Sequence, residues 1–148
     1  MTSQRPYRSI PCLGALGELV RDLPEIEALY LFGSHAEGIA NTLSDVDLGV
    51  LLSSQVSPEE YFDIRCRYNI MFADVLKTAR VDVVVLNGAP VHLAFQIIAP
   101  RAIVFERDPV SRAHFEMGIT RKFLDFRPFL ETRKTYVKRQ LLQGEFFG

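Results

Sequence analysis

The stretch LFGSHAEGIANTLSDVDLGVLL, residues 31–52, decides the fold of this chain. One apolar run ends at Gly33-Ser34, ten residues follow, and Asp45-Val46-Asp47 then opens a second apolar run. Charged side chains are rarely buried without a partner, so two carboxylates in a strand-like segment need a chemical reason. Because side chains alternate along a strand, Asp45 and Asp47 are expected to face the same way.

Apolar patterning around this stretch predicts alternating helices and strands. Strands are expected at residues 28–32, 46–52, 81–86 and 101–106, and helices at 10–23, 61–79 and 90–99. A capping box at residues 57–60 starts the second helix, and Asp108-Pro109 is typical of the start of a long C-terminal helix. Pro128 should kink or break that helix near Phe126 or Arg127. The pattern predicts an α/β fold with about four strands in a sheet flanked by helices.

The composition suits one ordinary domain spanning residues 1–148. No apolar run reaches the roughly 18 residues of a membrane span, and no signal peptide is apparent, so a cytoplasmic protein is expected. Cys12 and Cys66 lack a zinc or disulfide context and are expected to be buried, reduced thiols. From Gly118 onward the chain contains seven basic residues and only three acidic ones, which indicates a solvated helix face or contact with a partner.

The paired acids are best explained by a metal site. Two carboxylates a few ångströms apart repel each other, and a divalent cation removes that conflict. Oxygen ligands of this kind suit Mg²⁺ or Mn²⁺. Asp82, at the start of the third predicted strand, is the best candidate for a third ligand, and three acids can hold two metals.

Gly33-Ser34 is expected to provide the other half of the site. Gly33 lets backbone approach a ligand closely, and Ser34 offers a hydroxyl at the start of a short helix predicted at residues 35–38. The first N–H groups of such a helix favour phosphate. A phosphate-binding loop beside a carboxylate metal site is the equipment for transferring a nucleotidyl group.

These residues resemble the signature of the polymerase-beta-like nucleotidyltransferase superfamily, which is Gly-Ser, ten residues, then Asp-x-Asp. Within it, the chain is similar to the MntA-type minimal nucleotidyltransferase antitoxins of HepT/MntA toxin-antitoxin systems. The likeness extends to Val81-Asp82-Val83-Val84-Val85-Leu86-Asn87-Gly88-Ala89-Pro90 and covers roughly residues 29–136. It implies a mixed sheet of about four strands and a long C-terminal helical segment kinked near Pro128.

The resemblance also implies an activity. Such antitoxins transfer AMP from ATP to a tyrosine of a HepT-like HEPN RNase toxin, which neutralises it, and a hetero-oligomer with the toxin is expected. By carry-over, Asp45 and Asp47 ligate both metals, Asp82 ligates the catalytic metal and helps deprotonate the acceptor, and Gly33 and Ser34 hold the β- and γ-phosphates.

The chain departs from the common Gly-Ser-Arg-Ala-Arg-Gly pattern, because His35 and Glu37 stand where the arginines are usual. His35 either contacts phosphate when protonated or is a solvent-exposed bystander. Two other functions stay open: stoichiometric occlusion of a partner without catalysis, and transfer to a small molecule. The second is disfavoured because only about 60 residues follow Asp82, which leaves little room for an acceptor-binding domain. Stable nucleic-acid binding and membrane association are not expected.

Overall fold

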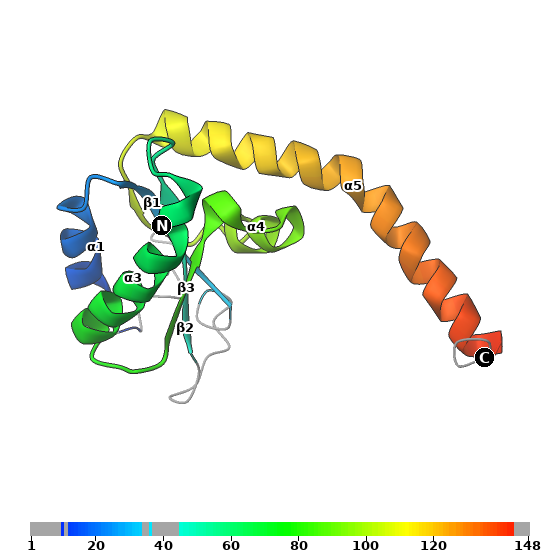
Figure 1. Cartoon of the computed structure of the whole chain (residues 1–148), viewed down its shortest axis with the longest axis horizontal. Helices are drawn as coiled ribbons and strands as arrows, with labels where there is room; N and C mark the ends of the chain where they lie inside the picture. The colour runs from blue at the N-terminus through cyan, green and yellow to red at the C-terminus, as the bar shows by residue number, and fades with distance from the viewer. Residues whose placement is uncertain (1–9, 11, 34–35, 37–44, 144–148) are drawn as a thin grey trace, which may run out of the picture.

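A four-stranded mixed sheet forms the centre of the computed structural model, which describes residues 10, 12–33, 36 and 45–143 (Figure 1). Its strands are Ile26–Phe32 (β1), Val46–Leu52 (β2), Val81–Val85 (β3) and Ile103–Glu106 (β4), in the spatial order β3-β2-β1-β4. Strand β1 pairs antiparallel with β2 and with β4, whereas β2 and β3 run parallel. The predicted four-stranded mixed sheet is therefore confirmed, and β3 is one edge of it.

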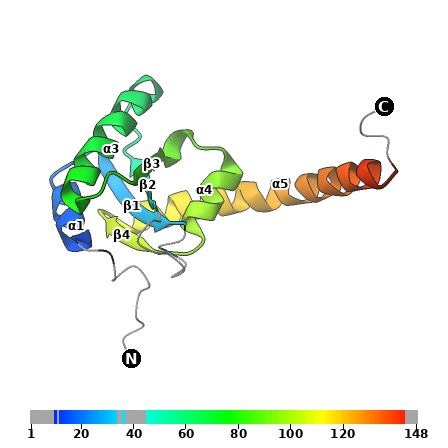
Figure 2. The ribbon, with the colours of Figure 1, turned by 90° about the horizontal axis from the view of Figure 1, so that it is seen from below.

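Helices cover both faces of the sheet (Figure 2). Helices Leu13–Arg21 (α1) and Tyr61–Leu76 (α3) pack on one face, where the larger core cluster lies. Helix Val91–Ile98 (α4) and the first part of helix Pro109–Gln143 (α5) cover the other face around Ala28, Tyr30 and Leu51. Two short 3-10 turns, Pro58–Glu60 (η2) and Leu86–Gly88 (η3), lead into α3 and α4. The strands of this second face extend beyond α4, and the end of the sheet that α4 does not cover carries the carboxylates.

Local signals in the sequence account for the helix starts. Ser57 and Glu60 form the predicted capping box before α3. At the start of α5, Asp108 accepts hydrogen bonds from the Val110 amide at 3.0 Å and the Ser111 hydroxyl at 2.9 Å. These bonds, above all that of the Ser111 hydroxyl, hold the pKa of Asp108 below its usual value. Helix α5 continues through Pro128 and bends nearby, so the predicted kink is confirmed (Figure 1).

A polar network joins the first part of α5 to the sheet. The buried Tyr30 hydroxyl of β1 donates to Oε1 of Glu116 at 2.7 Å, and Nη1 of Arg112 donates to the same atom at 2.6 Å. Arg112 also donates through Nε to Glu106 of β4. Burial, together with the hydrogen bond to Glu116, raises the pKa of Tyr30 well above its ordinary value. Tyr30 therefore stays a donor, and the network sets how α5 leaves the sheet.

Cys12 and Cys66 are free thiols, but both are exposed, so the expectation that they are buried is wrong. Cys66 lies on the solvent side of α3, and its neighbour in sequence, Arg67, is also exposed. Within the described part of the chain, no helix has the length and apolar character needed to cross a membrane.

Candidate functional site

Two of the three predicted carboxylates lie side by side at the end of the sheet that α4 does not cover. The parallel register of β2 and β3 pairs Asp47 with Asp82, and neighbouring strands lie about 4.8 Å apart. Paired residues share a face, so both side chains leave the sheet on the side that α4 covers further along. Asp45 is exposed and immediately precedes β2, at the two-residue spacing that suits the same face. The backbone therefore gathers the predicted acids at one place.

Gly33 is required beside Asp47 for two reasons. Its φ of +73° lies in the left-handed region that other residues rarely adopt. In addition, a Cβ built on Gly33 would collide with Oδ2 of Asp47, whose backbone pairs with that of Phe32. The predicted close approach at Gly33 is thus occupied, in this structure, by the carboxylate of Asp47. Ser34 and His35, the other two predicted phosphate-binding residues, lie outside the described residues, as does most of the predicted helix at 35–38.

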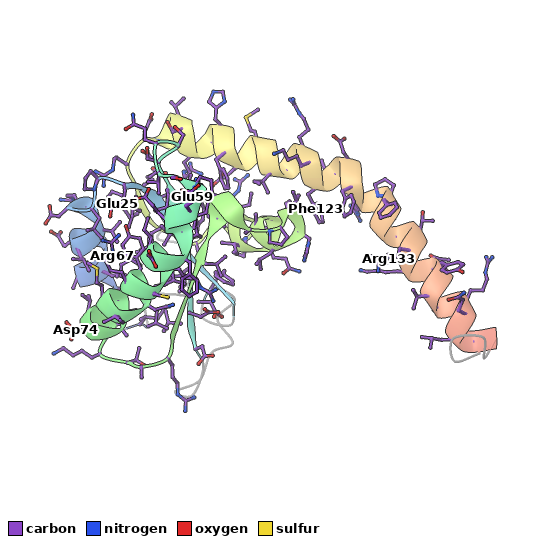
Figure 3. All side chains as sticks on the ribbon, in the orientation of Figure 1. Glu25, Glu59, Arg67, Asp74, Phe123 and Arg133 are labelled. Carbon is purple, nitrogen blue, oxygen red and sulfur yellow. The ribbon has the colours of Figure 1, made fainter. Side chains whose placement is uncertain are left out.

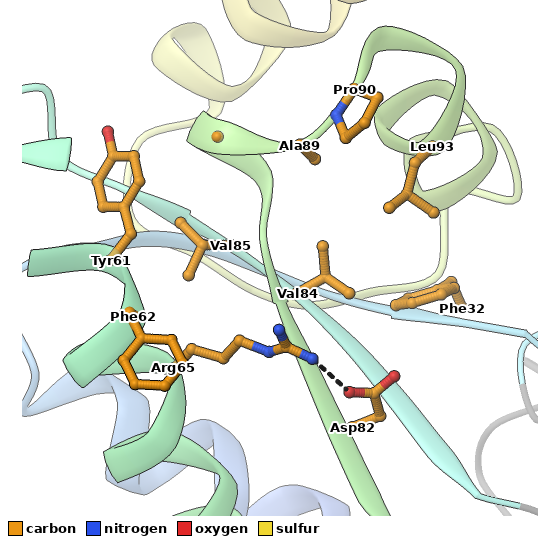
Figure 4. A pocket seen from close by; sticks show the side chains of 11 residues that line it. Phe32, Tyr61, Phe62, Arg65, Asp82, Val84, Val85, Ala89, Pro90 and Leu93 are labelled. Atoms are coloured by element: carbon orange, nitrogen blue, oxygen red, sulfur yellow. Dashed lines mark hydrogen bonds and ion pairs between the residues drawn. The ribbon is translucent and has the colours of Figure 1, made fainter. Parts of the chain in front are cut away.

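Asp82 is held by a residue that sequence reasoning missed, Arg65 of α3 (Figure 4). Nη2 of Arg65 lies 3.4 Å from Oδ1 of Asp82, with both side chains about half exposed, at 49% and 51%. Nε of Arg65 donates to the carbonyl of Val83 at 2.8 Å, which anchors the guanidinium at the edge strand. One turn further on, Oδ1 of Asn69 accepts a hydrogen bond from the Val83 amide at 2.9 Å. Two side chains of α3 thus secure the segment of β3 that carries Asp82.

The only signal for Arg65 in the sequence is the spacing of Tyr61, Arg65 and Asn69, which places them on one stripe of the helix. Such a stripe is equally typical of a solvated helix face. Its role becomes apparent only once α3 is seen to pack beside β3.

A hollow of about 530 Å³ opens beside Asp82. Among the described residues that line it, only Arg65 and Asp82 are charged. The rest of the wall is mostly apolar and comes from the end of β1, from α3, from β3 and from the segment leading into α4: Phe32, Tyr61, Phe62, Val84, Val85, Gly88, Ala89, Pro90 and Leu93 (Figure 4). A mostly apolar pocket of this size with a few charged groups at one side is typical of a ligand site.

The donor set fits a hard divalent cation in its chemistry and in its backbone placement. Carboxylate oxygens are the ligands that Mg²⁺ and Mn²⁺ prefer, and the β2–β3 register brings two of them together. Their side chains are not yet arranged around a common point. Within the described stretches, no three His, Cys, Asp or Glu side chains form a group that could hold a metal. Binding would require Asp82 to turn from Arg65 toward Asp47.

The comparisons with known proteins agree with this geometry. Residues 15–110 match the family model described as "Polymerase beta, Nucleotidyltransferase", a span that contains Gly33, Asp45, Asp47 and Asp82. The chain belongs to the polymerase beta nucleotidyltransferase family. No curated protein matches this nucleotidyltransferase chain at a significant level.

Solved structures with the same fold include toxin-antitoxin complexes. The chain is similar to one described as a toxin-antitoxin with AMP-PNP, at 19% identity and a TM-score of 0.59, covering 89% of this chain and 98% of that one. It is also similar to a structure of the toxin-antitoxin MntA-HepT, at 18% identity and a TM-score of 0.56, covering 88% and 97%. A third is a tri-AMPylated Shewanella oneidensis HEPN toxin in complex with MNT antitoxin, at 18% identity and a TM-score of 0.54, covering 88% and 96%. At these identities the likeness establishes the fold.

Proposed function

We propose that this nucleotidyltransferase is an antitoxin that transfers AMP from ATP to a tyrosine hydroxyl of a HEPN-type RNase toxin and so neutralises it. The observation that supports this most is the pairing of Asp47 with Asp82 beside Gly33, at the end of the sheet that α4 does not cover. The fold is shared with toxin-antitoxin structures, one holding AMP-PNP and one containing an AMPylated toxin. Because ATP is the donor, we place the reaction in the cytoplasm, within a hetero-oligomer of antitoxin and toxin.

In this proposal, Asp45 and Asp47 hold both divalent cations, and Asp82 holds the one on the acceptor side. Magnesium is the expected ion, and manganese could replace it. When bound, such cations neutralise phosphate charge and acidify a hydroxyl that they contact. Gly33 and Ser34 would hold the β- and γ-phosphates, and His35 would lie beside them.

The reaction assigns a separate role to Asp82. The phenol oxygen forms a bond to the α-phosphorus of ATP. The bond between that phosphorus and the oxygen that bridges the α- and β-phosphates breaks, and pyrophosphate leaves. The phenol proton must go to a base. Asp82 lines the hollow, which supports assigning it the role of accepting the proton of an acceptor bound there. A free tyrosine has a pKa of roughly 10, so the acceptor hydroxyl would have to be made more acidic by a bound cation before Asp82 could take its proton.

The test is labelling of the toxin with ATP that carries radiolabel in its α-phosphate. We expect the wild-type chain to label the HEPN-type toxin and to raise its intact mass by whole AMP units. The variant Asp45→Asn with Asp47→Asn should keep its fold and its affinity for the toxin but transfer no label. Labelling by this double variant at the wild-type rate would refute the site assignment.

The same experiment addresses the non-catalytic alternative. If the toxin is neutralised by wild-type antitoxin with no change in mass, the chain acts by occlusion and the AMP-transfer proposal is wrong. A small-molecule acceptor would be indicated if label from ATP appears in a low-molecular-weight product and never in the toxin.

A further inference from the structure

The second half of α5 leaves the body of the molecule, and we call residues 124–143 of that helix the arm (Figure 1). Before the arm, α5 packs on the body: Ile119 is buried, and the Phe123 ring stacks on Phe95 of α4 with centroids 4.0 Å apart. Beyond Phe123 none of the side chains whose burial the structure describes is buried. Figure 3 shows this change between Phe123, beside α4, and Arg133, which projects from the arm.

The arm nevertheless carries an apolar face. At 3.6 residues per turn, one side of the arm carries five apolar side chains around the exposed Arg133: Phe126, Phe129, Tyr136, Val137 and Leu141. Four of the five are exposed, with Phe129 and Tyr136 at 59%. Two contacts lie within the face, between the rings of Phe126 and Phe129 and from Gln140 to the Tyr136 hydroxyl at 2.7 Å. The apolar face of the arm continues the side of α5 that packs on α4, but no described part of the chain lies against this face.

An uncovered helix of this kind calls for a partner. Helices of about 20 residues gain little stability from propensity alone and depend on packing of an apolar face. The arm is about 30 Å long, and one face of such a helix offers surface on the order of the ~800 Å² that one protein contributes to a stable interface. Regularly spaced anchors such as Phe126, Phe129 and Tyr136 are typical of a helix bound in a groove.

Charge narrows the choice of partner. The arm contains five of the chain's 17 Lys and Arg residues but only two of its 18 Asp and Glu residues. Arg127, Lys134 and Lys138 follow one edge of the apolar face at helical spacing. Two arms packed on each other would bring these like charges together, which disfavours a second copy of this chain. RNA phosphates could pair with the basic residues of that edge, but RNA has no apolar surface for Val137 and Leu141 to pack against.

We infer that the arm is a docking element for a protein partner with an apolar groove rimmed by acidic residues. The inference rests on the proposed function in one respect: the partner is the acceptor protein of the AMP transfer. The arm bends toward the side of α5 on which α4 and the sheet lie, so a protein seated on it also adjoins the body (Figure 1). The arm therefore supplies affinity, while the carboxylates supply chemistry.

The test compares two double-alanine variants of the full-length chain. Phe129→Ala with Tyr136→Ala removes two aromatic anchors from the apolar face. Thr135→Ala with Arg139→Ala is the matched control, because these residues lie on the opposite side of the arm. Alanine has a higher helix propensity than each of the four residues it replaces. Circular dichroism should therefore show that both variants keep the wild-type helix content.

Binding of the HEPN-type toxin is measured by isothermal titration calorimetry. Exposed aromatic anchors become hot spots when bound, so the test variant should bind on the order of 100-fold more weakly, and the control within about three-fold of wild type. In AMP transfer, the KM for the toxin should rise by a similar factor while kcat stays unchanged. Wild-type binding should weaken with added salt, and Lys134→Glu should reduce both affinity and that salt dependence.

Equal affinity of the test variant and wild type would overturn the inference. Two other results would also overturn it: a concentration-dependent dimer of the free chain that the test variant abolishes, or RNA binding that Lys134→Glu abolishes while toxin affinity is unchanged. These failures differ from that of the proposed function. The Asp45→Asn, Asp47→Asn variant retains the arm, so full binding without transfer supports both proposals, and transfer by that variant refutes only the site assignment.

Discussion

The substitution Gly33→Ala tests how tightly the loop and the carboxylates are built together. An alanine at φ +73° would sit in the left-handed region, which costs about 1–2 kcal/mol for residues other than glycine. Its Cβ would also overlap with Oδ2 of Asp47, so either that carboxylate or the backbone must move. We therefore expect a loss of about 1–3 kcal/mol in the free energy of unfolding. Misplacement of a reacting group by about 1 Å can lower a rate about 100-fold, and we expect a loss of that size in AMP transfer.

The matched control is Gly14→Ala. Gly14 lies in α1, has no neighbour within 4 Å of its added Cβ, and does not have a positive φ. Because alanine has a higher helix propensity than glycine, the free energy of unfolding of this variant should rise by about 0.5–1 kcal/mol, and its activity should be unchanged. Urea denaturation gives both free energies, and labelling of the toxin gives both rates. If Gly33→Ala matches Gly14→Ala in stability and activity, the close packing of Gly33 on Asp47 is wrong.

Three further substitutions test other parts of the structure. Arg65→Gln should remove a side chain that competes with a cation for Asp82. Since half-exposed ion pairs contribute about 0.2–1 kcal/mol, Mn²⁺ should bind this variant up to about five-fold more tightly in an electron paramagnetic resonance titration. Weaker Mn²⁺ binding would show instead that Arg65 supports the metal site. Tyr30→Phe should lessen the loss of stability at high pH, because a tyrosine whose pKa is raised by folding contributes stability below pH ~10 that disappears above it. If wild type and Tyr30→Phe lose the same stability at alkaline pH in urea denaturation, the hydrogen bond of Tyr30 to Glu116 does not contribute as proposed. Gly49→Ala should destabilise by about 1–3 kcal/mol, because its Cβ would meet the Ile97 side chain under α4, and a neutral result would place α4 elsewhere.

Features encoded within a few residues of one another could be predicted from the sequence. The capping box before α3, the Asp108 cap of α5 and the bend near Pro128 depend on neighbouring residues alone, and the structure contains all three. The strand positions of Asp47 and Asp82 were predictable because each opens an apolar run. Their pairing depends on the parallel register of β2 and β3, which chain order does not specify.

What depends on packing between distant elements could not be predicted. Arg65 acts on Asp82 only because α3 lies against the edge strand, and no local pattern distinguishes it from Arg67, the other basic residue of that helix. Likewise, the sequence left open whether the basic C-terminal helix is a solvated face or contacts a partner, and only the structure shows that the last part of α5 extends past α4 with its apolar side chains exposed. The exposure of Cys66 has the same cause, because burial of a helix side depends on which face packs inward.

The central claim is that three aspartates converge on divalent cations beside Gly33. It is tested most directly by the anomalous scattering of Mn²⁺ in a crystal grown with a non-hydrolysable ATP analogue. The account predicts manganese peaks about 2.1 Å from carboxylate oxygens of Asp45, Asp47 and Asp82, with Asp82 turned away from Arg65. Manganese bound elsewhere, or Asp82 still paired with Arg65 beside bound nucleotide, would contradict it.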